Sequence, residues 1–226
     1  MKNICLFIFS IIFSFSAYSQ QETVSSTSNN CDNTEYNSIN AKNSSNNSFL
    51  PPIWSEDFSS GFPSNWSRNS TNMGGGFATC NWQWTLDGTY GYYNGNQGTS
   101  GSNELTSSTA SDGFLICDID SANHYANGQP SGSTYQYIES IVTTNAIDLS
   151  SNPAVSLEFE HLYRYNNLGN NNFTPPTVYV SSDSINWIPY LVNNGLSNNT
   201  QSSNPEYTSI NISSVAGNQS TVYIRF

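Results

Sequence analysis

Short apolar runs alternate with polar residues along most of the chain, and Gly, Pro, Asn and Asp separate the runs. Residues 154–165 are the clearest example. One face of this run carries Val155, Leu157, Phe159, His161, Tyr163 and Tyr165. The other face carries Ser156, Glu158, Glu160, Leu162 and Arg164. A period of two is typical of a β-strand, so we expect a strand with one buried and one wetter face.

Similar runs elsewhere predict a chain built almost entirely of strands. We expect them near residues 53–58, 81–86, 112–119, 134–142, 154–165, 176–182, 186–192, 206–212 and 220–226. No stretch has a sustained helical period. Many short strands without helices indicate an all-β sandwich or barrel, and their number favours a two-sheet jelly-roll sandwich. Because the sequence stops inside an alternating run at Phe226, we expect this jelly roll to be truncated before its last strand.

The first residues have the pattern of an export signal. Lys2 precedes an apolar run, and residues 17–19 place small residues where a signal peptidase reads them. The sequence therefore predicts a signal peptide over residues 1–19, a Ser/Asn-rich disordered linker over 20–50 and one domain over 51–226. The apolar run is too short to span a bilayer comfortably, so we expect a secreted or cell-surface protein without a membrane span.

The composition supports an extracellular β-rich protein and argues against a nucleic-acid-binding protein. The 226 residues carry a net charge of -11 with only five scattered Lys and Arg, which argues against nucleic acid as a partner. Aromatic residues make up 14% and charged residues 9%, a balance that suits an extracellular β-rich protein. Cys31, Cys80 and Cys117 follow the signal segment, and export permits a disulfide. We favour Cys80 with Cys117 because both lie inside the predicted domain, although three cysteines define no fixed framework.

Several motifs in order resemble one family. They are Trp54 to Phe58 with Gly61 and Trp66, Asn81 to Trp84, Asp112 to Asp120, Val155 to His161, Val178 to Asp183, and Val222 to Phe226. Together they resemble the MAM-like jelly-roll domains of secreted and surface proteins of Bacteroidota, which include choice-of-anchor J domains and, more distantly, gingipain cleaved adhesin domains. This resemblance implies a non-catalytic adhesion or recognition module of a larger exported protein, which binds an extracellular glycan or protein.

Carboxylates gather at two places that could hold a cation. Glu56 and Asp57 form one group, and Asp118 and Asp120 form the other. Calcium takes several oxygen ligands, so all four are candidate ligands. The resemblance implies structural Ca²⁺ near the first strand, with Glu56 at the matching position, whereas the family's final Asp-Asp pair is absent from this sequence. Alternatively, Asp118 and Asp120 end a strand and accept hydrogen bonds from a loop.

A second pair of carboxylates raises the possibility of an enzyme. Glu158 and Glu160 share one strand face about 7 Å apart, so a jelly-roll glycoside hydrolase that uses both is the alternative function. Such a pair needs an enclosed cleft that separates the two pKa values. We favour a solvent-exposed strand face. His161 is expected in the core, and neither histidine lies in a nucleophile or zinc pattern.

Aromatic residues suggest where a ligand binds. Tyr90, Tyr92 and Tyr93 lie among glycines and are the candidate glycan-binding loop, whereas Trp82 and Trp84 are expected in the core. Residues 181–187 resemble a shortened Asp-box hairpin. There Asp183 would accept hydrogen bonds from turn amides and Trp187 would pack beneath the turn.

Overall fold

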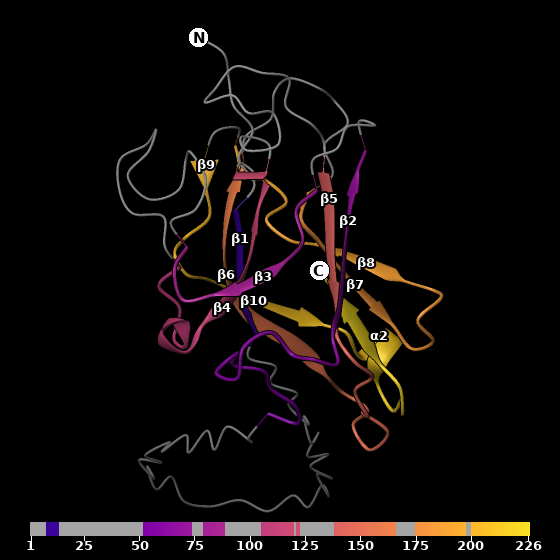
Figure 1. Cartoon of the computed structure of the whole chain (residues 1–226). Helices are drawn as coiled ribbons and strands as arrows, with labels where there is room; N and C mark the ends of the chain where they lie inside the picture. Colours follow the sequence, from indigo (N-terminus) through magenta and orange to yellow (C-terminus); the bar gives the residue numbers. More distant parts are fainter. Residues whose placement is uncertain are drawn as a thin grey trace, which may run out of the picture.

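The computed structural model describes residues 8–13, 52–73, 79–88, 105–119, 121–122, 138–165, 175–197 and 200–226. Their strands form two antiparallel sheets, which lie side by side in Figure 1. The first sheet has the order β10 (Glu206–Asn211), β6 (Ser156–Tyr165), β1 (Ile8–Phe13), β4 (Phe114–Asp118) and β3 (Gln83–Thr85), and β9 (Thr200–Gln201) pairs with the end of β6. The second has the order β2 (Ser67–Asn72), β5 (Ile138–Thr143), β11 (Tyr223–Arg225), β7 (Thr177–Ser181) and β8 (Ile188–Leu191). The short helices η1 (Ala110–Asp112) and α2 (Ser213–Ala216) connect strands. The predicted all-β class is confirmed.

The two sheets enclose a common apolar core. Leu157 and Phe159 on β6 belong to the same buried cluster as Val178 and Val180 on β7. The ring centroids of Phe159 and Phe226 lie 5.5 Å apart at an edge-to-face angle of 83°, so they join the layers directly. The predicted alternation of residues 154–165 is correct for this inner face.

The prediction for the other face of β6 is wrong. We expected it to be wetter, yet Glu158, Leu162 and Arg164 are buried there. At Leu162 the cause is a second apolar cluster, in which Leu105 from the segment before η1 packs with Leu162, Phe114 and Ile116. Because a loop covers this face, both faces of β6 are largely dry. An alternation pattern cannot reveal a cover that arrives from another part of the chain.

The strand predicted at residues 53–58 is also wrong. Phe58 has a positive φ of 61°, and Gly61 N donates to its carbonyl oxygen at 2.9 Å, so this stretch turns instead of extending. Trp84 Nε1 donates to the same oxygen at 2.8 Å. The strand that follows is β2, a run of polar residues that gave no apolar signal. Pairing with β5 makes it a strand.

Strand β1 comes from the segment predicted to be a signal peptide. It pairs antiparallel with β4 and with β6, and Ile11 lies opposite Leu115 on one side and His161 on the other. The signal peptide remains a prediction. Cleavage after Ser19 would remove β1 and leave the facing backbone groups of β4 and β6 without this partner. The predicted linker over 20–50 lies outside the described residues. Within the described ranges, no helix is long and apolar enough to cross a membrane.

Candidate functional site

The outer surface of the second sheet carries the clearest candidate site. Inward side chains of its strands, such as Val180 and Ile224, are buried in the core, so the alternate positions point outward. We call this surface the aromatic face and define it by Glu139, Thr143, Tyr179, Trp187, Tyr223 and Arg225. All are half-buried except Glu139, which is exposed. The face therefore presents rings and polar groups on a rigid platform.

Strand register brings these residues together. Arg225 on β11 lies opposite Tyr179 on β7 and opposite Thr143 on β5. Tyr223 lies two positions before Arg225 on β11, opposite Ser181 on β7. Because side chains two apart on a strand share a face, the two tyrosines flank Arg225 on one surface. Ser67, Asn69 and Thr71 of β2 extend the surface with polar groups, since they lie opposite the outward residues of β5.

Arg225 is held in place by its neighbours. Its guanidinium carbon lies 3.7 Å from the centroid of the Trp187 ring, and its Nε donates to Thr143 Oγ1 at 3.2 Å. Partial burial lowers the pKa of Arg225, and the Glu139 carboxylate opposes that shift. A guanidinium stacked on an indole is a charged and planar contact whose side chain has already lost its rotational freedom. A ligand that meets it loses little further entropy.

The turn before β8 holds Trp187 through the hydrogen bonds of Asp183 and Ser184. The Asp183 carboxylate accepts hydrogen bonds from Ile185 N at 2.9 Å and Asn186 N at 2.7 Å. These bonds to backbone amides hold the pKa of Asp183 well below its usual range. Trp187 Nε1 then donates to Ser184 O at 3.2 Å, which orients the ring toward Arg225. The predicted role of Asp183 in the turn is therefore confirmed, whereas the Trp187 ring, expected beneath the turn, lies against Arg225 and belongs to the aromatic face.

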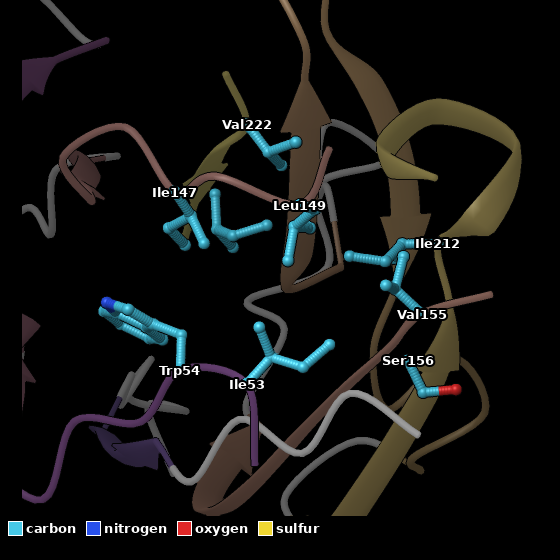
Figure 2. Close-up of a pocket in the computed structure, with 9 residues that line it drawn as sticks. Ile53, Trp54, Ile147, Leu149, Val155, Ser156, Ile212 and Val222 are labelled. Atoms are coloured by element: carbon cyan, nitrogen blue, oxygen red, sulfur yellow. The ribbon is translucent and has the colours of Figure 1, made fainter. Parts of the chain in front are cut away.

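An apolar pocket opens at one end of the core (Figure 2). Ile53 and Trp54 border it from the segment before β2, while Ile147, Leu149 and Val222 line the opposite side. The empty space there is about 330 Å³, part of which is open to solvent, and Ser156 is the one polar residue among the described residues that line it. None of the described lining residues carries a carboxylate, imidazole or thiol group.

The first acidic pair is divided between two roles. Glu56 Oε1 accepts a hydrogen bond from Phe58 N at 2.8 Å, and burial raises the pKa of Glu56, with a smaller rise caused by the Asp57 charge. Asp57 Oδ1 accepts from Ser59 N at 3.0 Å and from Ser59 Oγ at 2.8 Å, and these bonds lower its pKa. Asp57 thus closes a turn, whereas the Glu56 carboxylate is poorly solvated and would gain from a cation.

Of the second acidic pair, Asp118 lies on the first sheet. Asp118 at the end of β4 is buried, and its Oδ1 accepts from Ser121 N at 2.8 Å, which matches the loop-capping alternative. Asp120 lies outside the described residues. Among the residues that the structure describes, no group of three or more His, Cys, Asp and Glu side chains could hold a metal ion. The structure therefore does not bring the three described candidates, Glu56, Asp57 and Asp118, into one group of possible metal ligands.

Glu158 and Glu160 project from β6 toward the loop that covers it. Glu158 is buried with 8% of its surface exposed, and Ser209 Oγ on β10 donates to its Oε1 at 3.4 Å. Glu160 Oε2 accepts from both the N and the Oγ of Ser108, each at 2.7 Å. The expected exposed face is thus wrong for Glu158. Both carboxylates have structural partners, and Ser108 covers the approach to Glu160.

His161 lies in the core, as predicted, and its side chain is fully buried. Burial lowers the pKa of His161 to about 4, against the opposing effect of Asn193. Nε2 lies 2.7 Å from the Asn193 amide, and the orientation that satisfies both groups lets Asn193 donate to Glu206 at 2.9 Å. The imidazole is therefore neutral at physiological pH and joins β6 to the loop after β8.

The predicted aromatic loop cannot be placed in the same way. Tyr90, Tyr92 and Tyr93 lie outside the described residues. Trp82 is buried, as expected, and Trp84 is partly buried against the same core. Both tryptophans therefore pack in or against the core, as expected.

The residues of the aromatic face were not singled out as a group from the sequence. Tyr179 and Tyr223 occupy the outward positions of two predicted strands, so alternation alone could have marked each one. What the sequence lacks is the pairing order, which puts β11 between β5 and β7. Strands distant in sequence meet there, and no local pattern encodes that neighbourhood. Comparisons with family models, curated proteins and solved structures give no match to this chain.

Proposed function

We propose that this chain is a non-catalytic recognition module of a larger exported bacterial surface protein, and that it binds an extracellular glycan on the aromatic face. The proposal includes a MAM-like jelly-roll arrangement of the two sheets. It also includes structural Ca²⁺ held with Glu56. An extracellular protein is the alternative ligand, and the experiment below separates the two.

The observation that carries the proposal is the grouping of Tyr179, Trp187 and Tyr223 around Arg225 on the outer surface of one sheet. Sugar rings present apolar C–H faces that stack on aromatic side chains, while hydroxyl groups need donors and acceptors at the edges. Arg225 supplies donors, and Glu139, whose charge acts on Arg225, supplies an acceptor on the same face. The hydroxyl and amide groups of β2 extend the polar rim.

Charge supports a glycan over an anionic polymer. The chain has a net charge of -11, so a polyanion would meet repulsion over most of the surface. A neutral or weakly charged glycan needs no such complementarity. The rigidity of the platform also favours recognition, since side chains already ordered by stacking lose little freedom when a ligand binds.

The test is a glycan array followed by titration of any glycan that binds. Tyr179→Ala and Tyr223→Ala should each weaken binding about tenfold, because a stacked ring contributes on the order of 1 kcal/mol or more. Tyr207→Ala is the matched control, since this tyrosine is 58% exposed on β10 of the other sheet. Equal binding by all three variants would place the ligand elsewhere.

Two other outcomes address the remaining functions. One outcome is that no glycan binds, but the wild type captures a protein from the extracellular fraction and the Tyr179→Ala variant does not. In that case the alternative ligand, an extracellular protein, is correct. If a polysaccharide is cleaved and Glu158→Gln or Glu160→Gln abolishes the cleavage, the hydrolase alternative replaces the recognition module. We expect no cleavage, because the Ser108 amide and hydroxyl already occupy Glu160.

A further inference from the structure

Two cysteine thiols face each other inside the protein. Cys117 lies on β4, and Cys80 lies in the segment that leads into β3. Their Sγ atoms are 3.4 Å apart, and both residues are buried. A disulfide has a bond length of about 2.05 Å, so about 1.3 Å of closure is needed. Small rotations of the two side chains can supply a movement of that size.

The surroundings hold the pair together from both sheets. Cys80 N donates to Ser70 Oγ of β2 at 2.7 Å, and Ser140 Oγ of β5 donates to the Cys80 carbonyl. Cys80 is thus hydrogen-bonded to the second sheet, whereas Cys117 belongs to a strand of the first sheet. A covalent bond between them would connect the two layers. It would also close a loop whose ends are 37 positions apart.

We propose that Cys80 and Cys117 form a structural disulfide in the exported protein. Each thiol gives up one proton and one electron, and the two sulfurs join. The two electrons reduce a disulfide oxidant, either an oxidoreductase disulfide or oxidised glutathione, to two thiols. The reaction passes through a mixed disulfide, which the second cysteine resolves by attack on the bonded sulfur.

Burial determines when the bond forms. Because the thiolate is the reacting species, and burial raises the pKa of Cys117 well above its ordinary value, the folded pair reacts slowly with external oxidants. Oxidation therefore belongs to folding, before the core closes. Once formed, the bond lies beyond the reach of extracellular thiols. It acts as a permanent brace and does not switch.

The experiment uses the full chain, refolded with a mixture of oxidised and reduced glutathione. The protein is denatured without reductant, alkylated and digested. We expect a linked peptide pair that contains Cys80 and Cys117 and weighs 2 Da less than the two reduced peptides, and we expect Cys31 to be alkylated. Unfolding should occur roughly 5–15 °C higher in the oxidised than in the reduced protein.

A double variant with Cys80→Ser and Cys117→Ser is the control, and its melting temperature should not respond to oxidant. If it fails to fold, the alkylation pattern of the wild-type chain decides by itself. Full alkylation of both cysteines after oxidative refolding would overturn the proposal. A linked peptide that joins Cys31 to either partner would also overturn it.

Discussion

Gly113→Ala tests how the segment before β2 is attached to the first sheet. Gly113 follows η1 with a φ of 113°, and a Cβ at this position would lie 2.3 Å from Trp84 Nε1 and 2.5 Å from Trp84 Cε2. Non-bonded heavy atoms prefer about 3.5 Å or more, so the indole must move by about 1 Å. That movement would break the 2.8 Å hydrogen bond from Trp84 Nε1 to the Phe58 carbonyl.

Three effects add to the cost of Gly113→Ala. An alanine at this backbone conformation costs about 1–2 kcal/mol, the displaced ring about 1–2 kcal/mol, and the lost hydrogen bond about 1 kcal/mol. The sum is about 4 kcal/mol, or a drop in melting temperature of roughly 8–16 °C for a chain of this size. Gly195→Ala is the matched control. Gly195 also has a positive φ, of 135°, but its Cβ would meet no atom within 4 Å. It should cost only the backbone share, about 1–2 kcal/mol.

The assay is urea unfolding followed by tryptophan fluorescence. A double-mutant cycle with Trp84→Ala isolates the clash, because Gly113→Ala should cost about 2 kcal/mol less once the ring is gone. The reasoning fails if Gly113→Ala and Gly195→Ala have equal costs, or if the cycle shows no coupling between Gly113 and Trp84.

Three further predictions follow from individual contacts. Removal of residues 1–19 takes away β1, so the shortened chain should aggregate, as measured by light scattering, or unfold at a lower temperature than the full chain, as measured by calorimetry. An identical melting curve would mean that β1 contributes nothing to stability. His161 has a folded pKa of about 4, below its unfolded value of 6.5, so it stabilises the fold above pH 6.5 and this contribution is lost as the pH falls toward 4. The wild type should therefore lose about 2 kcal/mol more than His161→Gln between pH 7 and pH 5, and parallel pH curves would contradict this. Calcium should raise the melting temperature of the wild type but not of Glu56→Ala, and a wild type unaffected by both calcium and chelator would remove the metal from the account.

The strands that local chemistry determines were predictable. Residues 154–165 alternate regularly because β6 lies against the core on one side, and the inner positions Leu157 and Phe159 are buried as expected. Asp183 was identified from its turn motif, since its hydrogen bonds reach amides only two and three residues away. In both cases the pattern and its cause lie within a dozen residues.

Long-range contacts explain the features that the sequence patterns did not predict. β2 is polar and becomes a strand through pairing with β5, whose residues are about seventy positions away. Leu162 is buried on the outer face of β6 because Leu105, more than fifty positions earlier in the chain, packs against it. The aromatic face depends on β11 lying between β5 and β7. No local periodicity records which strands become neighbours, so these features required the folded chain.

The aromatic face is the centre of the functional proposal, and a single measurement tests it directly. It is the calorimetric titration of a glycan identified on the array into the wild type and into the double variant Tyr179→Ala with Tyr223→Ala. The account predicts that the double variant binds at least a hundredfold more weakly while its unfolding curve stays close to that of the wild type. Wild-type affinity in a folded double variant would contradict the claim that this surface is the binding site.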